Sequence, residues 1–249
     1  MSKQVLNEQT FSTANVQAFA KAETAGRMTY GGVIARSLFF LVLTVAFAVV
    51  GWNAAADVVV SSGLWFFLGY MLLIGISIAA ASNPRLAIVA GILYAVLMGT
   101  WMGSISRIYE AYYDGIVGQA IIATLATFLG ALFLYASRAV RVTSKFVRVV
   151  VVAMSGLLLM YVFGWFMSLF GIDLLFWTKP NTVGIVVSVL ICLLAAACLM
   201  IDFAVIETGV EGGAPADIGW YAAFGLLTTL VWLYLEILRL LAILRRAQG

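Results

Sequence analysis

Seven long apolar stretches divide the chain, and most of the charged residues lie between them. A helix needs roughly 20 apolar residues to cross about 30 Å of hydrocarbon, and each stretch is close to that length. Backbone groups inside lipid must be satisfied within the span, so stretches of this length form helices rather than barrel strands. The sequence therefore predicts an all-α membrane protein with seven transmembrane helices, at residues 33–53, 62–82, 86–106, 115–136, 147–170, 182–202 and 218–242.

The composition supports a membrane class. Of the 249 residues, 64% are hydrophobic and 10% are charged, whereas soluble domains are about 25% charged. The net charge is only +3, and the basic residues fall between apolar stretches instead of along one continuous face. We therefore expect the lipid bilayer as the partner, and no nucleic acid.

Residues 1–32 have no apolar core followed by a cleavage site, so they predict a flexible N-terminal tail rather than a secretory signal, with the seven-helix domain at residues 33–249. Lys and Arg are enriched on the cytoplasmic side of membrane proteins. With the N-terminus inside, the inner segments hold nine of them: Lys3, Lys21, Arg27, Arg36, Arg85, Arg138, Arg141, Lys145 and Arg148. The outer segments hold five: Arg107, Lys179, Arg239, Arg245 and Arg246. A cytoplasmic N-terminus is the expectation.

The side of the C-terminus is left open by this count. Arg245 and Arg246 follow the last span and favour the inner side, whereas seven spans place the C-terminus outside. A re-entrant final helix is the alternative to a full seventh span.

A stripe of small residues runs along the third predicted span, at Gly91, Ala95, Gly99 and Gly103. Small residues four positions apart share one helix face and let another helix approach closely. Close helix packing is the prediction, and a pore-lining role is the alternative.

Two carboxylates stand in apolar surroundings: Asp202 at the end of the sixth predicted span and Glu236 inside the seventh. A bare charge in hydrocarbon costs about 2.5–3.5 kcal/mol or more, so such groups are partnered, buried in protein or protonated. If the two meet on facing helices, they cannot both ionise cheaply and would share a proton. In the other arrangement Asp202 sits at the membrane interface in water, and Glu236 pairs with Arg239 one turn on.

Three other charged residues bear on these two arrangements. Arg85, between the second and third spans, is either a counter-ion for the carboxylates or an ordinary inner-surface charge. Glu110 and Asp114 form an acidic outer segment that could attract cations; the alternative is a solvated turn.

The residue inventory excludes several activities. The chain has no histidine, which removes a rhomboid-like serine protease. Its lysines lie in tails and loops, so a retinal Schiff base has no anchor. Asp202 is the only Asp near a span core, which argues against an aspartyl protease. Cys192 and Cys198 are about 240° apart on a helix and predict neither a disulfide nor a metal pair. We expect no enzyme and no cofactor.

Four segments resemble the bacterial branch of the transmembrane Bax inhibitor motif family (Bax inhibitor-1 like). They read MTYGGVIARS before the first span, YAVLMGTWMGSISRIYE in the third, DFAVIETGVEGGAP after the sixth and WYAAFGLLTTLVWLYLEILRLL in the seventh. The resemblance covers nearly everything after the tail. It implies six helices around a central seventh, in a bacterial-type plasma (inner) membrane.

The resemblance also implies a function, a pH-sensitive calcium leak through the bundle. By motif, its proton sensor falls on Asp202 and Glu236, with Arg85 as the basic residue that contacts them. This chain has Glu236 where the best-studied bacterial branch has Asp, and Met98 where relatives often have Glu. In this interpretation Ca²⁺ is the transported ion and not a bound cofactor. The alternative function is a non-conducting regulator that binds other membrane proteins, such as a protease, through the tail, the acidic loop from Glu207 to Asp217 and the basic loop from Arg138 to Arg148.

Overall fold

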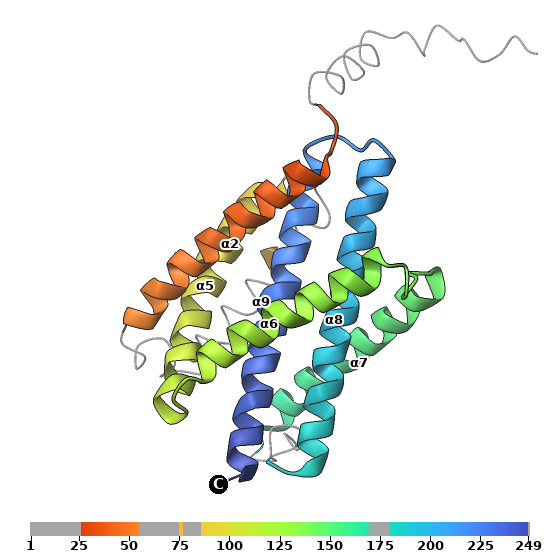
Figure 1. Cartoon of the computed structure of the whole chain (residues 1–249). Helices are drawn as coiled ribbons and strands as arrows, with labels where there is room; N and C mark the ends of the chain where they lie inside the picture. The colour runs from red at the N-terminus through yellow and green to blue at the C-terminus, as the bar shows by residue number, and fades with distance from the viewer. Residues whose placement is uncertain (1–25, 55–74, 77–85, 169, 171–179, 249) are drawn as a thin grey trace, which may run out of the picture.

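The computed structural model describes residues 26–54, 75–76, 86–168, 170 and 180–248, and over these ranges the chain is helical (Figure 1). Six helices are long and apolar enough to cross a membrane. They are α2 (Tyr30–Asn53), α5 (Ala87–Tyr112), α6 (Ile116–Ala136), α7 (Ser144–Ser168), α8 (Thr182–Glu211) and α9 (Ile218–Gln248). The all-helical prediction is confirmed for this part of the chain, whereas the predicted span at 62–82 lies outside the described residues except for residues 75 and 76.

Capping groups fix where several helices begin. The Thr29 hydroxyl accepts a hydrogen bond from the Gly32 amide (3.1 Å) at the start of α2, and the Asn181 side chain accepts one from the Gly184 amide (2.7 Å) at the start of α8. Such caps satisfy amides that have no partner inside the helix. The hydrophobic runs thus mark the helices, and short polar side chains set their first turns.

Two helix boundaries differ from the predicted spans. The prediction ends the sixth span at Asp202, but α8 continues to Glu211, so Asp202 lies well inside the helix. The predicted tail ends at residue 32, but α2 begins at Tyr30. Just before α2, the Met28 amide donates to the Ala214 carbonyl (2.8 Å) and the Ala216 amide donates to the Gly26 carbonyl (3.1 Å). The apolar pattern could not show where α8 ends, because the helix continues through polar residues. It could not show the contact of residues 26–28 either, because that contact is a short backbone pairing.

Helices α2 and α5 pack side by side over the small-residue stripe of α5. A Cβ added at Gly99 would lie 2.5 Å from the Thr44 carbonyl oxygen, and one added at Gly103 would lie 1.9 Å from that of Ala48. These distances are shorter than side-chain contacts allow, so the absent side chains set the spacing of the two helices. We call this contact the glycine seam.

The order of contacts along the glycine seam shows that α2 and α5 are parallel. Early residues of each meet at one end, Phe40 against Gly91, and later residues meet at the other, Ala48 against Gly103. The interval between Asn53 and Ala87 contains the predicted span at 62–82, and the total of seven spans stays a prediction.

Helix α9 lies at the centre of the described bundle. It packs against α2, α5, α6 and α8. In its most apolar stretch of 18 residues 56% are buried, against 6% in the corresponding stretch of α7. It is one continuous helix of 31 residues, and it ends at the opposite end of the bundle from the start of α2 (Figure 1). A re-entrant final helix is therefore not what the structure shows.

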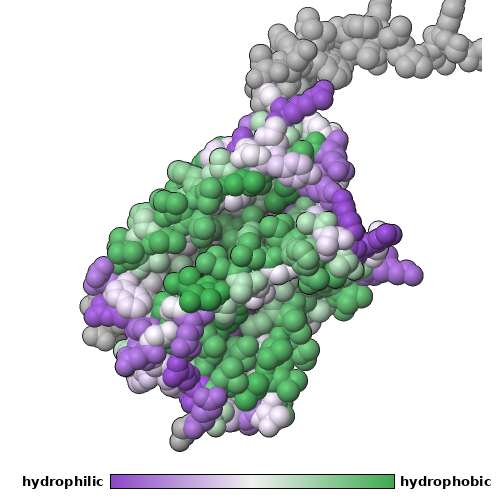
Figure 2. All heavy atoms as spheres, in the orientation of Figure 1, coloured by the Kyte–Doolittle hydropathy of each residue, from purple (hydrophilic) through white to green (hydrophobic). Residues whose placement is uncertain are grey.

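Apolar side chains cover the middle of the visible face, and hydrophilic ones gather toward its two ends (Figure 2). Large apolar residues of α2, α6, α7 and α8 are exposed on this bundle. Exposure on this scale is costly in water and favourable in lipid. The helices form a multi-pass membrane bundle.

Candidate functional site

Glu236 is the buried carboxylate of α9, with only 7% of its side chain exposed. Its Oε1 atom accepts hydrogen bonds from the Tyr161 hydroxyl of α7 (2.9 Å) and from the Trp232 indole N–H one turn earlier (3.1 Å). Its Oε2 atom is in ion-pair contact with Nη2 of Arg239 and has no hydrogen-bond partner. The contact is electrostatic rather than an aligned hydrogen bond. Glu236 therefore has a counter-ion within its own helix.

Arg239 completes this cluster from the next turn of α9. Its Nη1 donates to the Tyr161 hydroxyl (3.0 Å), so Tyr161 bridges the carboxylate and the guanidinium. The Arg239 side chain is 19% exposed, and its Nε and Nη2 atoms have no hydrogen-bond partner. Cys192 of α8 and Tyr109 of α5 lie within electrostatic range of both charges. We call Glu236, Arg239, Tyr161 and Trp232 the Glu236 cluster.

Asp202 occupies a different depth, nearer the start of α9. Its Oδ1 lies against the backbone of Gly225, 3.6 Å from where a Cβ would be, and its carboxyl group is hydrogen-bonded to Thr229. Its Oδ2 is buried and has no hydrogen-bond partner. No cation is in contact with Asp202 in the described part of the chain.

The predicted meeting of Asp202 and Glu236 does not occur in this structure. The antiparallel register of α8 and α9 places Asp202 beside Gly225 and Thr229, and it places Cys192 at the level of Glu236. Thr229 and Glu236 are seven residues apart, which is about 10 Å along a helix. The Glu236–Arg239 pair is instead the other arrangement that the sequence left open, although Asp202 is largely buried rather than at a watery interface.

The remaining predicted residues have separate surroundings. Arg85 lies outside the described residues. Glu110 binds the first turn of α6, because its two carboxylate oxygens accept from the amides of Gly115 (2.7 Å) and Val117 (2.9 Å). Asp114 is exposed in the turn beside it. Glu110 thus serves as a helix cap, and the cation-attracting role of Glu110 and Asp114 stays a prediction.

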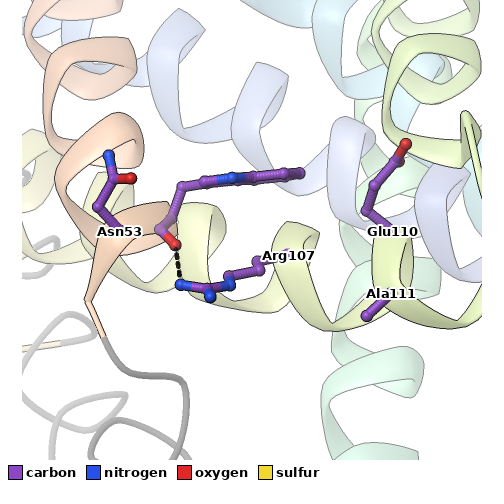
Figure 3. Close-up of a pocket in the computed structure, with 5 residues that line it drawn as sticks. Asn53, Arg107, Glu110 and Ala111 are labelled. Atoms are coloured by element: carbon purple, nitrogen blue, oxygen red, sulfur yellow. Dashed lines mark hydrogen bonds between the residues drawn. The ribbon is translucent and has the colours of Figure 1, made fainter.

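A pocket of about 310 Å³ opens where α2 and α5 end, lined by Trp52, Asn53, Arg107, Glu110 and Ala111 (Figure 3). Arg107 does not point into open space there. Its Nη1 donates to the Trp52 carbonyl (2.7 Å), one of the last carbonyls of α2. This cation therefore satisfies a helix C-terminus. Neither Asp202 nor Glu236 lines this pocket.

A second carboxylate cluster joins α6 and α8 at the end of the bundle where α2 begins. Glu207 accepts from the Tyr135 hydroxyl and is in ion-pair contact with Arg138, whose Nη1 donates to it at 3.1 Å. Hydrogen bonding to Glu207 raises the pKa of Arg138, so the guanidinium stays charged. The sequence assigned Glu207 and Arg138 to separate loops, and only the fold shows that they pair.

A polar contact that the sequence did not suggest links α5 to α9. The Ser106 and Tyr234 hydroxyls are 2.7 Å apart, and both residues are buried. The sequence does show a hydroxyl-bearing residue inside an apolar span, for Ser106 as for Tyr161. Such a hydroxyl indicates a contact between helices, but it does not identify the partner residue.

Among the described residues, no three Cys, Asp or Glu side chains gather as a metal site would require. Asp202 on α8 and Glu236 on α9 are instead two separate carboxyl groups beside α9, which we call stations, and within the described part of the chain only Glu236 has a counter-ion. Such stations can hold a proton or contact a passing cation, but neither supplies enough ligands for a resident metal ion.

The comparisons with known proteins are consistent with the helical architecture. No curated protein and no solved structure matches the chain. A family model described as Bax inhibitor 1 like matches residues 5–246, which is nearly the whole chain. The chain therefore belongs to the Bax inhibitor 1 like family.

Proposed function

We propose that the protein is a pH-sensitive cation leak, with Ca²⁺ as the principal ion, in a bacterial-type inner membrane. Membership of the Bax inhibitor 1 like family and the resemblance described above support this activity. The observation that carries it is the Asp202 carboxyl group, which is buried against α9 with one oxygen unpartnered. A group in this position links protonation to helix packing.

The physical argument rests on what a negative charge does at Asp202. When protonated, the carboxyl group is neutral and fits against Gly225 and Thr229 at little electrostatic cost. Loss of the proton places a negative charge in the α8–α9 interface with no counter-ion among the described residues, which is unfavourable unless water or a cation enters. Deprotonation therefore favours a state in which this interface is open. The equilibrium between closed and open packing follows pH.

Glu236 has a different role in this proposal. The Arg239 guanidinium is in ion-pair contact with its carboxylate and donates to the same Tyr161 hydroxyl, so Glu236 has a counter-ion in the closed packing. The two carboxyl groups then act as separate stations along α9, not as one hydrogen-bonded pair. Asp202 responds to protons, and Glu236 provides a second negative charge deeper along the helix.

The orientation also belongs to the proposal. The exposed basic residues Arg138, Arg141, Lys145 and Arg148 lie around the start of α7, at the end of the bundle where α2 begins (Figure 1). The positive-inside rule places this end in the cytoplasm, and it places the C-terminus of α9 outside.

Liposome flux tests the proposal. Purified protein is reconstituted in liposomes loaded with a Ca²⁺ dye, and flux is measured between about pH 5 and 8. We expect wild type to exceed empty liposomes and to conduct more as the pH rises, whereas Asp202→Asn shows a flattened profile. Asp114→Asn is the matched control, because it makes the same change in an exposed turn. Wild-type flux equal to empty liposomes contradicts the leak, and an unchanged profile in Asp202→Asn contradicts the role of Asp202.

The second candidate function, a non-conducting regulator of other membrane proteins, uses the exposed basic segment from Arg141 to Arg148. This function is favoured by the basic side chains of that segment, which contact no carboxylate among the described residues, whereas Arg138 already pairs with Glu207. Absence of flux together with a stoichiometric partner recovered from native membranes favours this function over the leak.

A further inference from the structure

The carboxylate of Glu236 already has a cationic partner, the guanidinium of Arg239 on the same helix. The Arg239 guanidinium contacts the Oε2 atom and reaches the same Tyr161 hydroxyl that binds the Oε1 atom. Oε2 and the Arg239 Nε and Nη2 atoms have no hydrogen-bond partner. One guanidinium nitrogen contacts the carboxylate directly and another contacts Tyr161, so the pair is not the bidentate Arg–carboxylate arrangement in which two parallel N–H groups bind the same carboxylate.

We propose that Arg239 is a tethered cation that occupies the Glu236 station and excludes divalent cations from it. This inference rests on the proposed leak, and it assigns to Arg239 the regulation of one of its two stations. When the guanidinium swings away, the Glu236 carboxylate offers oxygen atoms of the kind that Ca²⁺ binds. When it returns, the station is filled and electrically neutral.

The surroundings of the pair leave Arg239 as its dominant charge. The groups that face Glu236 are Trp232 on its own helix, Tyr161 from α7, Cys192 from α8 and Tyr109 from α5. None of these carries a positive charge. Within the described residues, Arg239 alone neutralises Glu236.

Because Arg239 is attached to the same helix as Glu236, it can compete with an ion in bulk solution; we call this attachment the tether. A charged group attached three residues away acts at an effective concentration on the order of mM or more. Ca²⁺ at lower concentration rarely displaces it. Among the described residues, Asp202 has no such tethered partner, so the two carboxyl groups differ in how easily a cation from solution reaches them.

A binding experiment tests the tether directly, with Tb³⁺ as the probe because it binds the same oxygen ligands as Ca²⁺ and is excited by a nearby tryptophan. Trp232 is hydrogen-bonded to Glu236 and therefore serves as the local donor. Its signal is the difference between a protein with Trp232 and the same protein carrying Trp232→Phe. We expect Arg239→Gln to raise the apparent affinity for Tb³⁺ about tenfold or more over wild type, as removal of an intramolecular competitor predicts. Excess Ca²⁺ should displace the signal.

The matched control is Arg246→Gln, which removes an arginine two turns further along α9 that is hydrogen-bonded to the Tyr113 hydroxyl (2.9 Å). It should leave Tb³⁺ binding at the wild-type level. The double variant Glu236→Gln with Arg239→Gln should lose the binding gained in Arg239→Gln. A folded Arg239→Gln protein with wild-type affinity overturns the tether, and so does a gain that persists in the double variant.

Arg239→Gln leaves Glu236 buried without a counter-ion, so a second variant covers the case in which it does not fold. Tyr161→Phe removes the hydroxyl that holds Arg239 and preserves the ring. It should raise Tb³⁺ affinity by a smaller factor, about threefold, because the tether stays but is less confined. Wild-type affinity in Tyr161→Phe, when Arg239→Gln does not fold, overturns the proposal.

Flux separates this inference from the leak itself. If Arg239→Gln gains Tb³⁺ binding but neither it nor wild type conducts, the leak fails and the tether stands. If wild type conducts and Arg239→Gln changes neither binding nor flux, the tether fails and the leak stands. If both hold, Arg239→Gln conducts more than wild type at every pH tested.

Discussion

The glycine seam and the polar contacts of α9 hold helices together in opposite ways. At the seam, α2 and α5 touch where α5 has no side chains: the carbonyl oxygens of α2 face Gly99 and Gly103, and the Phe40 ring faces Gly91. Around α9, contact with α7 and α5 uses ionised and hydroxyl side chains, such as Glu236 with Tyr161 and Ser106 with Tyr234. In lipid the hydrophobic effect does not drive helices together. The seam therefore depends on shape, and the contacts of α9 depend on satisfied polar groups.

This difference predicts which changes each region tolerates. A shape-dependent contact fails when volume is added and is indifferent to charge. A polar contact fails when one partner is removed and tolerates removal of both, because an unpaired buried charge costs more than a neutral pair. The following variants test that contrast, beginning with the largest effect.

Glu236→Gln removes one partner of the buried ion pair and leaves Arg239 without its counter-ion. We expect a loss of about 3–5 kcal/mol in the free energy of unfolding, the range for breaking a buried pair on one side. The double variant Glu236→Gln with Arg239→Gln should recover most of that loss. Unfolding in mixed detergent micelles measures both. Equal losses in the single and double variants would show that the pair is not the source of the cost.

Gly103→Ala adds a methyl group to the glycine seam, where its Cβ would lie 1.9 Å from the Ala48 carbonyl oxygen. We expect a loss of about 1–3 kcal/mol from overpacking. Gly130→Ala on α6 is the matched control, because nothing lies within 4 Å of its added Cβ, and Ala is favoured over Gly inside a helix. The same unfolding assay measures both variants. A Gly103→Ala protein as stable as Gly130→Ala would contradict backbone contact at the seam.

The two regions also differ in what the sequence reveals. The stripe Gly91, Ala95, Gly99 and Gly103 is periodic, and a four-residue period names the face that is packed. The helix that packs on it, α2, was not named by the pattern, because many apolar helices can accept such a face. The spacing of small residues is a local property of one helix. The sequence therefore predicts the packed face of α5, but only the fold shows that α2 packs against it.

For the carboxylates the sequence indicated which residues are unusual but not what they meet. An acid in an apolar run signals a buried site through its desolvation cost, and this identified Asp202 and Glu236. Their partners depend on the register of α8 against α9. Helix α8 is apolar on every side over residues 182–201, so no polar stripe marks its inward face or its depth. The same ambiguity hid Tyr161, which is 75 residues from Glu236.

Ser106→Ala tests a neutral polar contact of α9, the hydrogen bond between α5 and Tyr234. We expect a loss of about 1 kcal/mol in the free energy of unfolding, because a neutral hydrogen bond contributes less than a buried ion pair. Combining Ser106→Ala with Tyr234→Phe should cost little more than either change alone, since both partners then disappear. Additive losses would show that the two hydroxyls contribute through separate contacts.

Arg138→Ala should have the smallest effect of the four, because the Arg138 side chain is 61% exposed although it pairs with Glu207. Water and salt screen an exposed pair, so its removal changes the free energy of unfolding far less than Glu236→Gln does. Glu207 keeps its hydrogen bond from Tyr135 in this variant, so no buried charge is left alone. The comparison uses the same unfolding assay at low and high salt, where wild type and Arg138→Ala should converge as salt rises. If Arg138→Ala is instead as destabilising as Glu236→Gln and insensitive to salt, burial is not what separates the two ion pairs, and the contrast between the contacts of α9 and the exposed end of the bundle fails.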